Sequence, residues 1–377
     1  MRRLVILDDL FPHLGTAFRI AEYNAYLEHF ESAAVYSTAS AFPYIGETRS
    51  FSTVLAEYES HYPQYKNRVF RFASWRNFES TLTYTVFINN AFRFIDVAER
   101  HRVPLVYTLY PGGGFSLNDP EADARLRRVC SSPSFRAVIV TQRISYEYLV
   151  NRELCDPRRI EFIYGGFGPV DHLTTTNVTK KYYQRDKDTF DICFVAFKYT
   201  ARGVDKGYDV FVEVAKALSR AHSDIFFHVV GNYDETDIDV SDIRDRMTFY
   251  GTRYTEWFPG FYSGMDIIVS PNLPFVLTPG SFDGFPTTSV CEAALCGVAA
   301  LCTDVLNLNV AFQDRKELVI IPRDIDGICE IVDDYYNNLD ELYELAGKGQ
   351  QAIEKVASYE SQIRPRLRLL SKHAMER

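Results

Sequence analysis

The sequence SFDGFPTTSVCEAALCG, residues 281–297, combines an acidic loop with the start of a helix. Pro286 suits the first turn of a helix, because its missing N–H is not needed there. Thr287 and Thr288 add hydroxyl donors beside the free backbone N–H groups of that turn. Since the N-terminus of a helix attracts anions, this stretch predicts a phosphate-binding helix start directly after an acidic loop.

The remainder of the stretch predicts how this helix ends. Gly297 is expected to close the helix as a C-terminal cap, and residues 298–302 are typical of a buried strand. Apolar runs of strand length recur along the whole chain, mostly separated by segments of helical length. Strands that are apolar throughout and alternate with helices indicate a parallel sheet covered on both faces. In the N-terminal half these runs are residues 4–7, 34–36, 69–72, 84–88, 104–109, 137–140 and 160–164.

Length and composition limit the possible classes of protein. The chain has 377 residues, of which 46% are hydrophobic and 24% charged. These values predict a soluble globular protein of two domains. The formal net charge of −9 argues against a protein that binds nucleic acid through a basic surface.

Seven cysteines, without a CxxC pair, predict reduced thiols and no zinc site. The apolar run after Met1 is too short for a signal peptide, and no run approaches the length of a transmembrane helix. We expect a cytoplasmic protein with at most a peripheral contact at the inner face of the membrane. The basic residues near the C-terminus allow a weak membrane-surface patch or an ordinary solvated helix.

A cluster of glycine and proline at residues 165–169, followed by a polar stretch, predicts the domain boundary. The expected organisation is an N-terminal domain over residues 1–170, a linker over 171–188, a C-terminal domain over 189–350 and a helical tail over 351–377.

Two loops at strand ends in the first half are candidates for contact with a ligand. Gly112, Gly113 and Gly114 directly follow the run 104–109, where glycine allows positive φ or a close approach of the backbone. The alternative is a plain flexible turn. His13 and Gly15 occupy the equivalent loop after the first strand, and His13 is either a ligand contact or a surface histidine. Ligands of such sheets bind at the carboxyl ends of the strands.

Three cations stand between a strand and a helix in the second half: Lys198, Arg202 and Lys206. They are either a solvated basic loop or, as we prefer, the partners of an anion held at the helix start near residue 287. Gly231 follows the next strand and is included with them among the candidate ligand-binding residues. The acidic segment 234–245 has no metal-binding pattern.

These motifs resemble those of the retaining family 4 glycosyltransferases, which are also called glycosyl transferases group 1. Asp283-Gly284-Phe285-Pro286 resembles the family's Glu-Gly-Phe-Pro, and the sequence EAALCG at residues 292–297 resembles its Glu-Ala-Met-Ala-Cys-Gly. Lys206-Gly207 resembles the Lys-Gly pair that binds the donor diphosphate, and residues 164–171 resemble the segment that ends the N-terminal domain. The resemblance implies the GT-B fold, an α/β architecture of two Rossmann-like domains facing each other across a cleft.

The family's roles carry over residue by residue. Asp283 would contact the transferred sugar and Glu292 the nucleotide ribose, while Lys206, with Lys198 or Arg202, would neutralise the diphosphate without a metal or cofactor. The donor-binding set would also include Gly284, Phe285, Pro286, Thr287 and Thr288. Asp283 and Glu292 are nine residues apart rather than the family's eight, so we expect the extra residue in the turn before the helix.

The implied activity is transfer of a hexose from a nucleotide diphosphosugar to a glycan or lipid-linked acceptor, with retention of anomeric configuration. Bacterial surface polysaccharide biosynthesis is the expected pathway, again by resemblance. Two alternatives remain: a degenerate partner subunit that binds the nucleotide sugar without turnover, and a sugar-nucleotide epimerase of the same fold.

Overall fold

The computed structural model describes residues 4–375 except 74–79, 167, 169 and 175–176. Its contacts divide the chain into two compact units. The N-terminal unit comprises Met1–Gly168 together with Ser358–Arg377, and the C-terminal unit comprises Pro169–Ala357. Phe167 and Pro169, within the segment that resembles the end of a family 4 N-terminal domain, lie outside the described residues.

The N-terminal unit contains a parallel sheet of seven strands in the order β3-β2-β1-β4-β5-β6-β7. All seven apolar runs identified in this half form strands, although the strand of the run at 84–88 both begins and ends two residues earlier. The strands are β1 (Leu4–Asp8), β2 (Ala34–Ser37), β3 (Val69–Arg71), β4 (Leu82–Val86), β5 (Leu105–Leu109), β6 (Phe135–Val140) and β7 (Ile160–Phe162).

Helices cover this sheet because their apolar residues fall on one side. In α1, the side chains of Ile20, Tyr23 and Leu27 are buried, as their spacing predicts. The helices of eight or more residues in this unit are α1 (Ala17–His29), α2 (Phe51–His61), α3 (Ile88–His101), α4 (Pro120–Cys130), α5 (Arg143–Asn151) and α12 (Tyr359–Met375).

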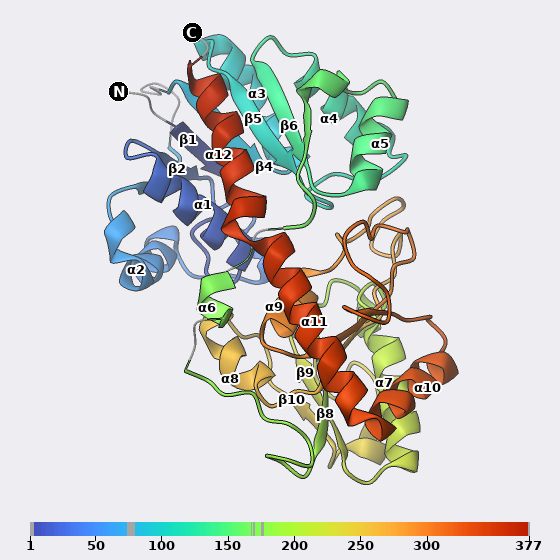
Figure 1. Ribbon diagram of the computed structural model, residues 1–377. Helices are drawn as coiled ribbons and strands as arrows, with labels where there is room; N and C mark the ends of the chain where they lie inside the picture. The colour runs from blue at the N-terminus through green and yellow to red at the C-terminus, as the bar shows by residue number, and fades with distance from the viewer. Residues whose placement is uncertain (1–3, 74–79, 167, 169, 175–176, 376–377) are drawn as a thin grey trace. The chain divides into compact units, whose positions relative to one another are not determined.

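The last helix, α12, completes the core of the N-terminal unit. It lies beside α1, as Figure 1 shows, and contributes Ile363, Leu367 and Leu370 to the same hydrophobic cluster as β1 and β4. Gln362 Nε2 donates a 2.7 Å hydrogen bond to the carbonyl oxygen of Tyr164. The end of the chain therefore packs against its beginning.

Arg366 of α12 is fully buried in this core. Burial alone would lower the pKa of its guanidinium, but the nearby Tyr110 and Glu22 raise it above its ordinary value. Glu22 of α1 accepts hydrogen bonds from the hydroxyl groups of Tyr26, Tyr84 and Tyr110. Tyr110 is therefore close to the buried guanidinium and hydrogen-bonded to the buried Glu22 carboxyl.

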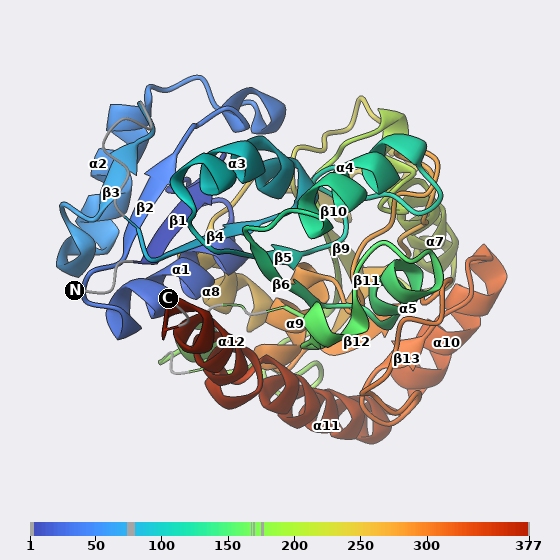
Figure 2. The same cartoon turned by 90° about the horizontal axis from the view of Figure 1, so that it is seen from above.

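The C-terminal unit contains a parallel sheet of six strands in the order β10-β9-β8-β11-β12-β13. Its helices pack on the sheet and on one another, and Figure 2 shows α7 beside α10. The strands are β8 (Phe190–Val195), β9 (Ile225–Val230), β10 (Met247–Phe249), β11 (Ile267–Ser270), β12 (Ala299–Cys302) and β13 (Val319–Ile320). The helices are α6 (Val170–Thr174), α7 (Tyr208–Ala221), α8 (Phe258–Tyr262), α9 (Thr288–Leu295), α10 (Ile325–Asn337) and α11 (Leu339–Ala357).

Candidate active site

The strand order of the C-terminal sheet reverses between β8 and β11, which pair in parallel. Ligands of open α/β sheets bind outside the carboxyl ends of the strands at such a switch point. The two loops that leave these strand ends are residues 196–207 and 271–287, which contain the predicted cations and the acidic loop. The topology therefore brings two sequence-predicted groups of residues to one place.

Lys206 and Asp283 form an ion pair between these two loops. The Lys206 Nζ atom lies 2.8 Å from Asp283 Oδ1 and 2.7 Å from Oδ2. Burial alone would lower the pKa of Lys206, but the Asp283 carboxylate raises it above its ordinary value. Lys206 is therefore a protonated cation across the physiological pH range, held beside a carboxylate that is 39% exposed.

Asn272 is a member of this group that the sequence reasoning missed. Its Nδ2 atom donates a 2.7 Å hydrogen bond to Asp283 Oδ2. Ser270 Oγ donates to Asn272 Oδ1 at 2.7 Å, and Thr303 Oγ1 donates to the Asn272 carbonyl oxygen at 2.7 Å. The sequence signal that could have indicated Asn272 is its position two residues beyond β11 at the switch point, because asparagine is otherwise common in loops.

The two loops approach so closely that Gly207 is required between them. Gly207 has a φ of 75°, and a Cβ atom there would lie 2.2 Å from the carbonyl oxygen of Pro271. The backbone N–H of Leu273 also donates a 3.0 Å hydrogen bond to the carbonyl oxygen of Asp205. The loop that carries Lys206 is thus fixed against the loop that carries Asn272.

The start of α9 differs from the prediction at one residue. Pro286 was expected in the first turn of the helix, and this is wrong: α9 begins at Thr288, its N-terminal cap is Thr287, and Pro286 precedes the cap. A cis peptide bond joins Phe285 to Pro286. The first N–H groups of α9 have no partner within the helix, as at every helix start.

The end of α9 forms as predicted. Gly297 has a φ of 77° and its N–H donates to the carbonyl oxygen of Ala294, while the N–H of Val298 donates to that of Ala293. This pair of hydrogen bonds is the Schellman motif, which satisfies the last carbonyl groups of a helix. The strand β12 follows immediately, so α9 is anchored at the end opposite to the acidic loop.

Glu292 lies in the second turn of α9 and is only 7% exposed. Burial raises the pKa of its carboxyl group to about 8. Among the described residues, no side chain or backbone group forms a hydrogen bond or ion pair with this carboxyl. A buried acid of this kind is a functional candidate, because protein acids are otherwise buried with a partner.

The other predicted cations do not join the pair of Lys206 and Asp283. Lys198 Nζ contacts Asp237 Oδ1 at 2.5 Å instead. Arg202 is exposed and has a φ of 56°. Gly231 has a φ of 136°, and a Cβ atom there would lie 1.9 Å from the carbonyl oxygen of Ala196, so this glycine allows the chain after β9 to approach the end of β8 closely.

An open hollow lies beside the acidic loop. Asp283 and Asn272 face it, together with the turn at Gly284 and Phe285 and the N-terminal cap Thr287. Its far wall consists of residues 302–306 and Leu308, which follow β12. The predicted sugar-contacting segment is thus accessible in the C-terminal unit.

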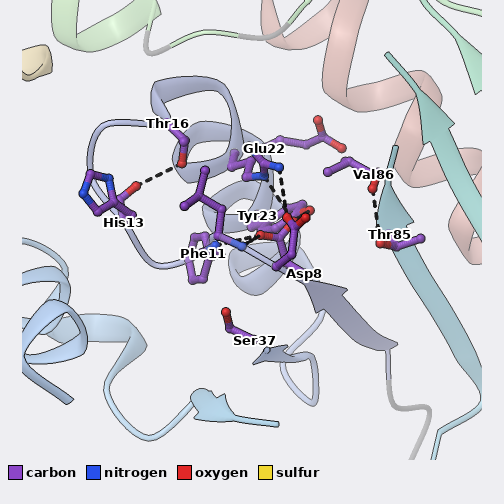
Figure 3. A network of polar contacts seen from close by, with 12 residues as sticks. Asp8, Phe11, His13, Thr16, Glu22, Tyr23, Ser37, Thr85 and Val86 are labelled. Carbon is purple, nitrogen blue, oxygen red and sulfur yellow. Dashed lines mark hydrogen bonds and ion pairs between the residues drawn. The ribbon is translucent and has the colours of Figure 1, made fainter. Parts of the chain in front are cut away.

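Asp8 organises the carboxyl end of β1 in the N-terminal unit. Its Oδ1 atom accepts hydrogen bonds from the backbone N–H groups of Leu10 and Phe11, and its Oδ2 atom accepts them from Arg19 and Tyr23. Figure 3 shows the backbone nitrogen of Phe11 and the side chain of Tyr23 beside this carboxylate. Asp8 therefore holds the predicted loop in shape from within the core.

His13, in this loop, is buried rather than on the surface. Its Nδ1 atom accepts a 3.1 Å hydrogen bond from the Gly15 N–H, so its Nε2 atom donates to Glu47 at 3.1 Å. Burial lowers the pKa of His13, and Glu47 opposes that effect. His13 and Gly15 thus connect the loop after β1 to the segment after β2.

The glycine loop after β5 has the backbone geometry that glycine alone adopts readily. Gly112, Gly113 and Gly114 all have positive φ values, between 55° and 91°. A Cβ atom at position 113 would lie 2.2 Å from the ring of Phe87, and one at position 114 would lie 2.0 Å from Asn89. Packing against the start of α3 therefore requires the second and third glycines, whereas Gly112 faces open space.

Residues 190–338 match the family model described as Glycosyl transferases group 1. The match covers the strands β8 to β13 and both loops of the candidate site. Over this segment the chain is similar to the group 1 glycosyl transferases. A comparison with curated proteins gives no match.

The chain has the GT-B fold, as solved structures of similar architecture show. HepE of Anabaena, solved with UDP and glucose, is 14% identical with a TM-score of 0.68, and the match covers 99% of this chain and 100% of that one. A glycosyltransferase from Rickettsia africae is 12% identical, with a TM-score of 0.68 and coverage of 100% and 99%. Sucrose-phosphate synthase from Thermosynechococcus elongatus is 13% identical, with a TM-score of 0.62 and coverage of 99% and 98%.

The described part of the chain contains no helix that is both long enough and apolar enough to cross a membrane.

Proposed function

We propose that this glycosyltransferase moves a hexose from a UDP-sugar to a glycan or lipid-linked acceptor, with retention of anomeric configuration. The pairing of Lys206 with Asp283 at the switch point of the donor sheet carries the proposal. UDP is the proposed nucleotide because HepE, a structure of the same fold, was solved with UDP and with UDP-glucose. The proposed pathway is bacterial surface polysaccharide biosynthesis.

The chemistry requires a cation beside the departing diphosphate. Departure of UDP leaves an oxocarbenium-like anomeric carbon and increases the negative charge on the β-phosphate. We assign the stabilisation of that charge to Lys206, which lies in the loop before α7, and to the N–H groups at the start of α9. Lys198 and Arg202 are assigned supporting roles on the phosphates. With these groups in place we propose that the reaction needs neither a metal ion nor a cofactor.

Asp283 is proposed to contact the transferred sugar. It faces the hollow beside Gly284 and Phe285, and its partial exposure leaves its carboxylate accessible to sugar hydroxyl groups. Lys206 would then exchange part of its contact with Asp283 for the phosphate. Donor binding would therefore open or share an ion pair that is closed in the free protein.

Glu292 is proposed to bind the two hydroxyl groups of the ribose. Its carboxyl is buried without a hydrogen-bonding partner among the described residues, and ribose would supply two donors to its oxygens. Hydrogen bonds to the ionised form would offset the desolvation that raises its pKa to about 8. This role explains an acid in an otherwise apolar helix.

The N-terminal unit is proposed to bind the acceptor at the carboxyl ends of β1 and β5. The loops there contain His13, Gly15 and the glycines at 112–114, and Gly112 is the position with open space beside it. The hydrogen bonds of His13 suggest that it shapes the loop and that backbone groups contact the acceptor.

Incubation of the purified protein with UDP-glucose, UDP-galactose and UDP-N-acetylglucosamine, with and without membrane lipid extract or oligosaccharide acceptors, tests the proposal. We expect UDP release that depends on an acceptor, together with a product whose anomeric signal matches that of the donor. Release of a free epimerised sugar nucleotide would favour an epimerase. Binding of UDP without turnover under any condition would favour a non-catalytic partner subunit.

A further inference from the structure

We propose that Asn272 is a positioning residue that keeps the Asp283 carboxylate directed into the donor site when Lys206 turns to the phosphates. The inference rests on the proposed function, in which Asp283 contacts the sugar and Lys206 the diphosphate. Asn272 carries no charge, and it acts on the reacting sugar only by holding the Asp283 carboxylate.

Among the residues that the structure describes, Lys206 and Asn272 together donate three side-chain hydrogen bonds to Asp283. Lys206 supplies two of them, at 2.8 and 2.7 Å, and Asn272 supplies the third, at 2.7 Å to Oδ2. Asp283 stands in a loop between β11 and α9 and is 39% exposed, so packing alone does not fix its side chain. Its orientation depends on these two partners.

The side chain of Asn272 is itself fixed in one orientation. Ser270 Oγ donates to its Oδ1 atom at 2.7 Å, which leaves Nδ2 facing Asp283. Thr303, at the end of β12, holds the Asn272 carbonyl oxygen at 2.7 Å. The side chain and the main chain of Asn272 are thus anchored to the carboxyl ends of two neighbouring strands. The ammonium group of Lys206, by contrast, ends a long flexible side chain.

Donor binding separates the tasks of the two partners. A diphosphate carries more charge than a carboxylate and competes for the ammonium group of Lys206. When Lys206 turns toward it, Asn272 is the partner that still directs Asp283 toward the sugar. An amide suits this task because it donates to a carboxylate without attracting the phosphates.

The test compares the affinities of UDP and UDP-glucose, measured by titration calorimetry, in the wild type and in Asn272→Ala. We expect UDP-glucose to lose about 10- to 100-fold in affinity relative to UDP, the range for a hydrogen bond to a charged group, and the turnover number to fall by a similar factor. The affinity for UDP alone should change less than threefold, because Asn272 does not contact the nucleotide. Asn337→Ala, an exposed asparagine on α10, is the matched control.

Asn272→Asp separates positioning from a general structural role. A second carboxyl opposite Asp283 makes the pair share a proton at low pH, so the acidic limb of the rate profile should move to higher pH. Loss of a merely structural contact would lower the rate equally at every pH. If Asn272→Ala does not fold, Ser270→Ala removes only the donor that orients the amide, and we expect a smaller loss in the same direction.

Each outcome decides the question. Equal losses for UDP and UDP-glucose would place Asn272 in the nucleotide pocket and overturn the proposal, as would unchanged turnover in Asn272→Ala. If the wild type binds UDP, UDP-glucose and UDP-galactose with equal affinity, Asp283 contacts no sugar and the positioning role of Asn272 is overturned. Absence of any UDP binding to the folded wild type would overturn the proposed function and, with it, this inference.

Discussion

The ammonium group of Lys206 contacts both carboxylate oxygens of Asp283, at 2.8 and 2.7 Å, although the two residues are 77 positions apart in the chain. They meet because β8 and β11 are neighbours in the sheet, so the loops that follow them leave the same edge. The residue predicted to bind the diphosphate is thus paired, in the ligand-free protein, with the residue predicted to contact the sugar.

Lys206→Ala should abolish most of the donor affinity. The variant removes the cation assigned to the diphosphate and leaves Asp283 unneutralised, so that a like charge faces the phosphates. We expect UDP affinity to fall by about 100-fold or more, in line with the loss of a partly buried charge-assisted contact. Titration of UDP followed by thermal stabilisation measures the change.

The control for this variant is Lys348→Ala. Lys348 forms an exposed pair with Glu344 on α11, and such surface pairs contribute little. Its UDP affinity should equal that of the wild type. Equal effects of the two variants would show that Lys206 has no special role in binding.

Because the pKa of Glu292 is raised, we expect the affinity for UDP to rise with pH. Because the free carboxyl has a pKa of about 8 and the ribose hydroxyls are expected to favour its ionised form, protonation opposes binding below that value. UDP affinity should increase by roughly 5- to 30-fold between pH 6.5 and 8.5. In Glu292→Gln this dependence should disappear, and a slope that persists in the variant would assign it to another group.

The same residue predicts a change in stability with pH. The pKa of Glu292 is raised from 4.5 in the unfolded chain to about 8 in the folded protein, so the folded state retains a proton that the unfolded state loses. Relative to Glu292→Gln, the wild type should be most stable below pH 4.5 and should lose a few kcal/mol as the pH rises to about 8. Urea unfolding at pH 5, 6.5 and 8 measures the difference.

The periodic features of the chain could be predicted well from the sequence. Apolar runs identified every strand of the N-terminal sheet, and a glycine at 297 correctly indicated how α9 ends. The two-residue strand β13 escaped notice because it is too short for a periodic pattern. Pro286 was misplaced because a proline favours the first helical turn and the residues before a helix alike.

The site could be predicted only in part. Lys206 and Asp283 were recognised from local motifs, and the fold then placed them in contact. Asn272 has no local motif: its role depends on Ser270 and Thr303, whose strands are adjacent only in the folded sheet. For the same reason, the separate pairing of Lys198 with Asp237 could not be read from the run of cations.

Gly207→Ala and Gly251→Ala form a matched pair of variants. Both glycines have positive φ, 75° and 68°, but only at position 207 would a Cβ atom meet the backbone, at 2.2 Å from Pro271. Gly251→Ala should lose about 1–2 kcal/mol from the left-handed conformation alone. Gly207→Ala should lose more, and should also weaken UDP binding because the loop of Lys206 must move; equal losses in the two variants would contradict this account.

Arg366 and Glu22 should behave as a coupled pair in unfolding experiments. Arg366→Met leaves the carboxylate of Glu22 buried without its cation, and we expect a loss of about 3–5 kcal/mol in the free energy of unfolding. The double variant Glu22→Gln with Arg366→Met should be more stable than Arg366→Met alone. Arg364→Met, at an exposed pair on the same helix, should lose less than about 1 kcal/mol.

The packing of α12 within the N-terminal unit has a consequence for biosynthesis. While the ribosome is still translating the C-terminal unit, the first sheet has been made but the helix that contributes Ile363, Leu367 and Leu370 to its core has not. The nascent N-terminal unit must wait, with part of its apolar surface uncovered, until residues 359–375 emerge. The N-terminal unit therefore cannot complete its folding before the C-terminal unit is translated, and the C-terminal unit is the first to have its whole core synthesised.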